Sequence, residues 1–202
     1  MLRSTILVPG FSDDTWCLRA MERFLQREGI PACTLSPQPS DGRVGIEVLA
    51  ARLADAVAVH FPDGAPLNFV GFSMGGLICR SYLQQIGGIV RAERLITIAT
   101  PHQGTWTAYI YNRPACRQMR PGSRFLAELN RDLSSLQGIQ FTSIWTPLDL
   151  TIVPAFSSWL PVGEMVPILS PFHRTMVVDL QILRTVAHCL RMPYQSNVQR
   201  DV

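Results

Sequence analysis

The pentapeptide GFSMG at residues 71–75, centred on Ser73, most constrains how this chain can fold. It follows an apolar run at residues 67–70, which predicts a short buried strand, and it precedes a helical pattern at residues 74–85. A Gly-x-Ser-x-Gly sequence in that context is typical of a nucleophile elbow, a sharp strand-to-helix turn that projects a serine oxygen above a sheet. A chance Gly-Ser turn is the alternative. Residue frequencies give about 0.07 such matches in a chain of this length, and the flanking strand and helix make chance rarer still.

Short apolar runs alternate with longer helical patterns along the rest of the chain. Strands are expected at residues 5–8, 32–35, 67–70, 95–99, 139–145 and 165–169, and helices at 14–28, 46–61, 74–85, 124–130 and 174–190. Strands that alternate with helices favour βα units around a mainly parallel sheet. We therefore expect an α/β fold with about six mainly parallel strands and helices on both faces, built from residues 1–202 as a single domain.

The longest connection between the expected strands is the segment at residues 100–138. It is rich in aromatic and basic side chains: Trp106, Tyr109, Tyr111, Arg113, Arg117, Arg120 and Arg124. Connections of this length inside a compact domain are often lids or binding loops. We expect residues 100–138 to form a lid or a substrate-binding loop.

The overall composition limits the kinds of molecule that the protein is expected to bind. Apolar residues make up 47% of the chain and charged residues 16%, against about a quarter charged in typical globular proteins. Either a large core or much apolar surface is therefore expected. The net charge of +3 is far from the clustered basic charge that nucleic-acid binding requires, so we expect no nucleic-acid partner.

The cysteines and the apolar segments predict a cellular setting. The five cysteines are odd in number, and no two lie at CxxC spacing, so neither a disulfide framework nor a zinc site is indicated. A reducing, cytoplasmic compartment is then the default. The first apolar run covers only residues 6–8, too short for a secretory signal. No stretch resembles a membrane-spanning helix, so the protein is expected to be soluble or at most peripheral to a membrane.

A serine hydroxyl becomes a useful nucleophile only when a base takes its proton and a carboxylate orients that base. After an elbow serine, the acid and then the histidine follow in chain order. His173 lies between the last expected strand and the last expected helix, at the carboxyl edge of the sheet, and is the best candidate for the base. His60 and His102 come too early in the chain, and His188 falls inside the last expected helix.

The candidate acid is Asp149, in the segment TPLDLTIVP that follows the fifth expected strand. An ordinary turn aspartate is the alternative there. Asp132 lies beside an expected helix end and Asp179 within the last expected helix. Glu164 and Asp201 are poorly placed.

Acyl transfer also needs hydrogen-bond donors aimed at the oxyanion that develops on the substrate. One expected donor is the backbone N–H of Met74, the residue after the serine. The other is the backbone N–H of Phe11, in the turn VPGF after the first strand, where Gly10 lets the backbone approach the substrate. A simple Pro-Gly turn is the alternative.

Four segments spread over residues 5–185 carry a family resemblance: LVPGF, GFSMGG, ITIATPHQGT, and PLDLTIVP with HRTMVVD. In them the chain resembles the small bacterial lipases of the α/β-hydrolase superfamily, the triacylglycerol-lipase-like group without a large cap domain. The resemblance implies a minimal α/β-hydrolase fold and a Ser73, Asp149 and His173 triad, with Phe11 and Met74 as oxyanion donors. It also implies carboxyl-ester substrates and neither a metal nor an organic cofactor.

Two features depart from that family pattern. The sheet begins at what is usually the third strand of the fold, and the oxyanion turn reads Pro-Gly-Phe where many relatives have His-Gly. The pattern also places His102 near the elbow, and we expect it to have a structural or substrate-rim role.

Aromatic side chains in the two connections nearest the expected site are candidates for substrate binding: Trp106, Tyr109, Phe156 and Trp159. They either line an acyl groove, touch a lipid surface, or simply pack the long loop. The function we expect is a serine carboxyl-ester hydrolase acting on acyl esters, glycerolipids among them. A thioesterase or acyltransferase with the same triad is the first alternative. A hydrolase-fold binding module that has lost activity is the second.

Overall fold

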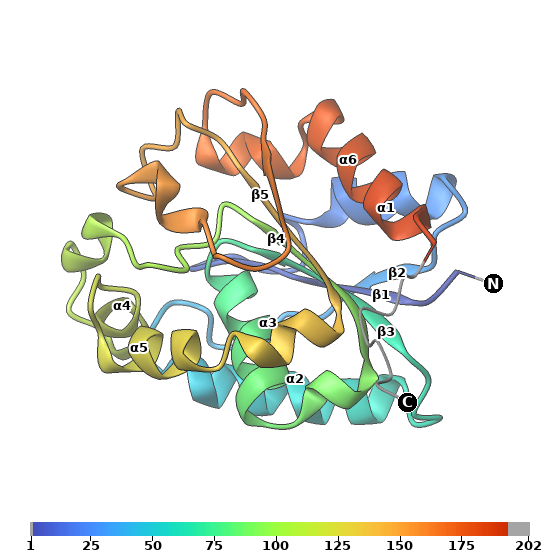
Figure 1. Ribbon diagram of the computed structural model, residues 1–202, viewed down its shortest axis with the longest axis horizontal. Coiled ribbons are helices and arrows are strands. Elements are labelled where there is room, and N and C mark those ends of the chain that lie inside the picture. The colour runs from blue at the N-terminus through green and yellow to red at the C-terminus, as the bar shows by residue number, and fades with distance from the viewer. Residues whose placement is uncertain (1, 194–202) are drawn as a thin grey trace, which may run out of the picture.

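The computed structural model describes residues 2–193, and a parallel β-sheet is its central element (Figure 1). Its six strands are β1 (Thr5–Val8), β2 (Ala32–Thr34), β3 (Leu67–Phe72), β4 (Ala92–Ile98), β5 (Gln140–Trp145) and β6 (Glu164–Pro167). They lie in the order β2-β1-β3-β4-β5-β6, and every neighbouring pair is parallel. The expected six-stranded, mainly parallel sheet is confirmed.

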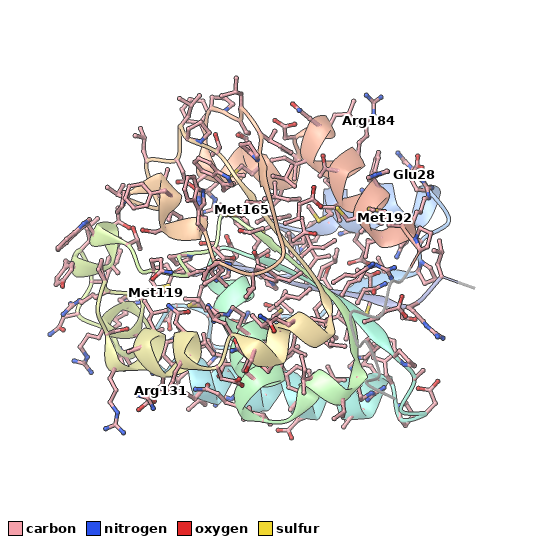
Figure 2. The ribbon with its side chains drawn as sticks, in the orientation of Figure 1. Glu28, Met119, Arg131, Met165, Arg184 and Met192 are labelled. Carbon is pink, nitrogen blue, oxygen red and sulfur yellow. The ribbon has the colours of Figure 1, made fainter. Side chains whose placement is uncertain are left out.

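Helices cover both faces of the sheet, as expected. The α-helices within residues 2–193 are α1 (Arg19–Arg27), α2 (Ile46–His60), α3 (Met74–Gln85), α4 (Pro114–Gln118), α5 (Arg124–Arg131) and α6 (Leu180–Arg191). Figure 1 shows α1 and α6 together on one face, and α2, α3, α4 and α5 on the other. In Figure 2, Arg131 of α5 and Arg184 of α6 point outward from these opposite layers. Short 3-10 helices lie at η1 (Gly88–Arg91), η2 (Trp106–Tyr109), η3 (Ser134–Gly138), η4 (Ala155–Ser158) and η5 (His173–Val177).

Each face of the sheet buries its own apolar cluster. Along β3, Phe69 packs with the α2 and α3 side, and the next residue, Val70, packs with the α1 and α6 side. Successive side chains of a strand point to opposite faces, and a parallel sheet is covered on both. This explains why all of β3 and β1 is buried.

The carboxyl-terminal helix is shorter than the sequence pattern predicts. Instead of one helix over residues 174–190, the chain forms η5, then an extended residue, Asp179, and then α6. The Asp179 side chain accepts hydrogen bonds from the N–H groups of Gln181 and Ile182, so it caps α6 rather than lying within it. Leu180, the first residue of α6, is about half exposed.

Two other elements differ from expectation in their details. The first helix begins at Arg19 rather than near residue 14, because turns occupy the preceding residues. Residues 100–138 contain η2, α4, α5 and η3, so the long connection has local structure of its own. No helix in the described part of the chain combines the length and apolar character needed to cross a bilayer.

Candidate functional site

Ser73 lies on the sharp turn between β3 and α3. Its backbone angles are φ 53° and ψ −123°, and a positive φ is uncommon for a residue with a side chain. The turn is fixed to the neighbouring strand, because the Ser73 N–H donates to the Ile98 carbonyl of β4 at 2.8 Å. This is the strand-to-helix elbow that the pentapeptide predicts.

The turn is possible only because glycines leave space beside it. A Cβ built on Gly75 would lie 2.1 Å from the Val8 carbonyl oxygen, and one on Gly76 would lie 2.1 Å from Thr100 Oγ1. Both distances are far inside van der Waals contact. The glycines therefore let the start of α3 pack directly on the ends of β1 and β4.

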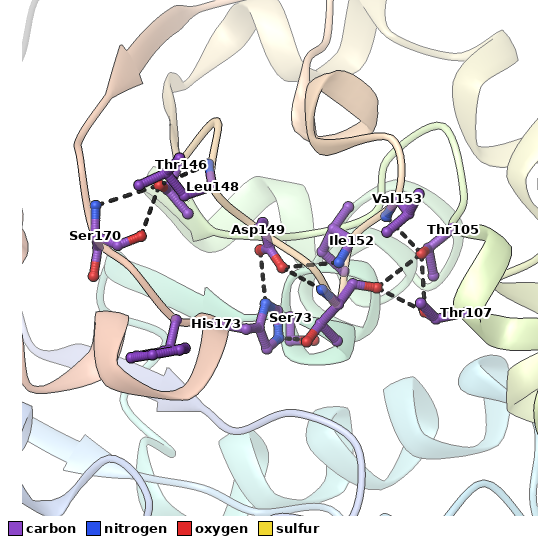
Figure 3. A network of polar contacts seen from close by, with 12 residues as sticks. Ser73, Thr105, Thr107, Thr146, Leu148, Asp149, Ile152, Val153, Ser170 and His173 are labelled. Atoms are coloured by element: carbon purple, nitrogen blue, oxygen red, sulfur yellow. Dashed lines mark hydrogen bonds and ion pairs between the residues drawn. The ribbon is translucent and has the colours of Figure 1, made fainter.

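Ser73, His173 and Asp149 form a continuous hydrogen-bonded chain (Figure 3). Ser73 Oγ lies 3.0 Å from His173 Nε2, and His173 Nδ1 lies 2.8 Å from Asp149 Oδ2. If Nδ1–H donates to the carboxylate, Nε2 is left to accept the serine proton. All three residues are buried but not sealed, with Ser73 8% and His173 9% exposed.

Parallel strands bring these three side chains together. Ser73 follows β3, Asp149 follows β5, and His173 begins η5 just after β6. The carboxyl ends of parallel strands share one edge of the sheet, and open α/β sheets bind ligands at this edge. The structure therefore places in contact the three residues that the sequence singles out at separations of 76 and 24 positions.

The two expected oxyanion donors belong to backbone segments next to Ser73. Within residues 2–193, the backbone N–H groups of Phe11 and Met74 have no hydrogen-bond acceptor in the protein. A Cβ built on Gly10 would lie 3.1 Å from Ser73 Cβ, so the turn after β1 lies close against the serine. The two donors follow β1 and β3, the neighbouring strands between which the strand order reverses. Two free N–H groups beside a serine hydroxyl are suited to receiving a negatively charged oxygen.

Asp13 is a charged residue near the site that the sequence analysis did not identify. It is buried and forms an ion pair with the exposed Arg174, the neighbour of His173. Burial raises the pKa of the Asp13 carboxyl, and the Arg174 charge opposes that shift. The pair joins the turn after β1 to the segment that carries His173. Sequence spacing offers no signal for it, because the two residues are 161 positions apart.

His102 is fully buried, so of its two expected roles the structure favours the structural one over the substrate rim. Its Nδ1 lies 3.2 Å from an Arg80 nitrogen and its Nε2 lies 3.0 Å from Thr97 Oγ1. Burial, together with the Arg80 charge, lowers the pKa of His102 well below its usual value. A neutral imidazole therefore accepts from Arg80 and donates to Thr97.

The remaining acid and base candidates lie away from Ser73. His60 ends α2 and His188 lies on the exposed side of α6. Asp132 follows the last residue of α5 and accepts hydrogen bonds from Ser134 and Ser135, and Glu164 is an exposed residue of β6. Asp201 lies outside the described residues.

The four aromatic candidates for substrate binding lie on the surface, in segments that leave the same edge of the sheet. Trp106 stacks on Tyr109 in η2, with ring centroids 5.6 Å apart. Phe156 and Trp159 contact each other in and after η4. All four are more than 40% exposed, so the structure does not bury them in the packing of the long loop.

Comparisons with known proteins agree with this geometry at the level of the fold. Residues 48–128, fewer than half of the chain, match the model of a family described as palmitoyl protein thioesterase. No curated protein sequence matches the chain.

Several solved structures are similar over nearly the whole chain. The mature form of lipase BlEst2 from Bacillus licheniformis superposes with a TM-score of 0.81 and 14% identity, covering 95% of this chain and 93% of that one. Lipase B from Aspergillus fumigatus gives 0.80 and 16% identity over 98% of this chain, which spans only 55% of that longer one. An extracellular α/β-hydrolase from a Paenibacillus species gives 0.66 and 13% identity, covering 93% and 97%. The chain has the α/β-hydrolase fold, in a minimal form with a six-stranded sheet between two helical layers.

Proposed function

We propose that the protein is a serine ester hydrolase of the lipase and esterase kind, related to the small bacterial lipases that it resembles in sequence. The hydrogen-bonded chain from Ser73 Oγ through His173 to Asp149 is the observation that supports this proposal most strongly. The two unpaired N–H groups beside the serine add to it, since acyl transfer needs both an activated oxygen and an oxyanion site.

In the proposed mechanism His173 transfers the proton, and Asp149 orients the imidazole ring of His173. Nε2 of His173 accepts the Ser73 proton while the serine oxygen attacks an ester carbonyl. The Phe11 and Met74 N–H groups stabilise the tetrahedral oxyanion. His173 then protonates the leaving alcohol, and a water deprotonated by the same nitrogen releases the acid from Ser73. Every step uses groups of this chain, and none requires a metal or an organic cofactor.

The test combines covalent labelling with turnover. A fluorophosphonate should label the wild-type protein at Ser73 and leave a Ser73→Ala variant unlabelled. The same variant should lose p-nitrophenyl ester turnover by on the order of 10⁴-fold or more while keeping its circular dichroism spectrum. An unlabelled but folded wild-type protein would favour the second alternative, a hydrolase-fold binding module without activity.

A thioester substrate is the second candidate, favoured by the match to the palmitoyl protein thioesterase family at residues 48–128. The same serine, base and oxyanion donors serve both reactions, because only the leaving group differs. A panel of p-nitrophenyl esters of increasing chain length, compared with palmitoyl-CoA and a palmitoylated peptide, separates the two. A kcat/KM at least about tenfold higher for the thioesters, a difference of about 1.4 kcal/mol, would replace the ester assignment.

Exposed apolar side chains around the site favour a lipid surface as the place of action. They include Trp16, Trp106, Ile110, Leu150, Phe156 and Phe172, each more than half exposed, and we call this set the apolar rim. All of them follow the carboxyl ends of strands, where Ser73 also lies. Exposed apolar groups that gather in one region are typical of binding surfaces. The rim therefore supports peripheral contact with lipid, and no oligomeric partner is proposed.

A further inference from the structure

The turn that carries Asp149 uses both oxygens of its carboxylate. Oδ2 faces His173 Nδ1 at 2.8 Å. Oδ1 accepts from the N–H groups of Thr151, at 2.8 Å, and Ile152, at 2.9 Å. The carboxylate is therefore held only as firmly as the backbone at residues 151 and 152. No helix or strand orders residues 146–154, so that backbone depends on other contacts.

The Thr105 hydroxyl supplies contacts on both sides of Ile152. It donates to the Thr151 carbonyl at 2.9 Å and accepts from the Val153 N–H at 2.9 Å (Figure 3). Thr107 Oγ1 lies 2.6 Å from the same Thr151 carbonyl. The N–H of Trp106 donates to the Val153 carbonyl at 2.9 Å. The segment after β4 thus forms hydrogen bonds with the turn that carries Asp149, on the side opposite His173 (Figure 3).

Burial makes the Thr105 hydroxyl hard to replace. The residue is 4% exposed, so water cannot easily take over its bonds. Removing the hydroxyl would leave the partly buried Val153 N–H without its acceptor, and a donor shielded from water that loses its partner destabilises the local arrangement. The turn would be expected to shift until that group found solvent, and Asp149 would move with it.

We infer that Thr105 is a positioning residue, which holds the turn at residues 149–153 so that Asp149 meets His173 in line. Thr105 belongs to the sequence TPHQGT, to which the proposed mechanism assigns no task. The inference rests on the proposed function, since the orientation of Asp149 affects turnover only if His173 acts as the base.

A double-mutant cycle with Thr105→Val and Asp149→Asn tests the inference, with kcat and KM measured on one soluble p-nitrophenyl ester. Thr105→Val keeps the side-chain shape and removes the hydroxyl, and Thr105→Ser keeps the hydroxyl as the matched control. We expect Thr105→Val to lower kcat about 10- to 100-fold with KM nearly unchanged, as displacement of a catalytic group by about 1 Å does. Thr105→Ser should retain most of the activity.

The Asp149→Asn background separates positioning from general loss of structure. That variant should retain a slow but measurable rate from the serine and the oxyanion donors. Within it, Thr105→Val should lower kcat by less than about twofold, because no carboxylate remains to be oriented. A loss of folded protein would instead lower both backgrounds by the same factor.

Each outcome decides a different claim. Equal losses in the two backgrounds, or an unchanged kcat for Thr105→Val, would overturn the inference and leave the proposed function intact. A Ser73→Ala variant that still turns over the ester would overturn the proposed function itself.

If Thr105→Val does not fold by circular dichroism, Thr107→Val takes its place in the cycle. That half-buried residue contacts the same carbonyl, and we expect a loss of about two- to fivefold, as for a single hydrogen bond, with the same dependence on Asp149. A Thr107→Val loss that is independent of Asp149, or no loss, would overturn the inference.

Discussion

The two buried histidines differ in what faces their ring nitrogens. His173 lies between a hydroxyl and a carboxylate, a setting in which a ring can accept a proton and remain stabilised. His102 lies between a threonine hydroxyl and the Arg80 guanidinium, so a second proton on its ring, at Nδ1, would face a like charge inside the core. The first environment suits proton transfer, and the second suits a fixed neutral link between α3 and the loop after β4.

This contrast predicts how single histidine substitutions affect turnover. We expect His173→Ala to lower kcat by about 10³-fold or more, as removal of the base does in serine hydrolases. His188→Ala, on the exposed side of α6, is the matched control and should stay within about twofold, since surface substitutions away from the site usually have small effects. Ester turnover of the purified variants is the measurement. Activity lost in His188→Ala but kept in His173→Ala would reassign the base.

The neutral state of His102 predicts an acid-sensitive fold. Its pKa in the folded protein lies well below 6.5, because of burial and of Arg80. Below pH 6.5 the unfolded chain therefore binds a proton that the folded chain does not, and stability falls as the pH falls. The contribution reaches about 1.4 kcal/mol per pH unit.

Urea unfolding at pH 7, 6 and 5 checks this expectation. A His102→Gln variant is less stable at pH 7 but cannot take up that proton, so its free energy of unfolding should fall less steeply between pH 6 and 5 than that of the wild type. Identical slopes would mean that His102 is protonated in the folded state or accessible to water.

At the scale of elements, the start of α3 depends on how closely it packs against β1. A methyl group on Gly75 would meet the Val8 carbonyl oxygen at 2.1 Å, and neither backbone can yield without disturbing the sheet. We expect Gly75→Ala to destabilise the protein by about 3 kcal/mol or more, in the range of severe overpacking. Thermal unfolding measures it.

Gly138 is the matched control for that substitution. It ends η3, and a Cβ there would meet nothing within 4 Å. Gly138→Ala should therefore change the free energy of unfolding by no more than about 0.5 kcal/mol. Equal effects of the two substitutions would show that close packing at the elbow is not what makes Gly75 necessary.

The arrangement of strands and helices also explains which parts of the structure can be predicted from the sequence. Ser73, Asp149 and His173 could be predicted to meet because each follows a strand, and parallel strands end at a common edge. The break at Asp179 could not, since the apolar spacing continues through it and only the local cap interrupts the helix. The contacts of Thr105 and Asp13 could not either, because they join loops whose positions depend on the whole sheet.

At the scale of the whole molecule, the apolar rim and the arginines of the long connection lie at the same end as the site. Residues 100–123 contain three arginines and no acidic residue. The Arg120 guanidinium lies over the Tyr109 ring at 4.5 Å, and that of Arg113 lies 5.8 Å from the Tyr111 ring centroid. Paired aromatic and cationic side chains are suited to the boundary between apolar lipid and charged headgroups. We therefore expect this end of the molecule to bind vesicles of anionic phospholipid.

Vesicle binding can be measured apart from catalysis, in a Ser73→Ala background, by cosedimentation with anionic vesicles. Replacing Trp106 and Phe156 together by serine should weaken binding at least about tenfold, because each side chain loses apolar area that the lipid would bury. Val90→Ser is the control, since Val90 is 86% exposed in η1, which precedes β4 at the opposite edge of the sheet. Equal binding by the rim variant and the control would mean that these aromatics do not face lipid.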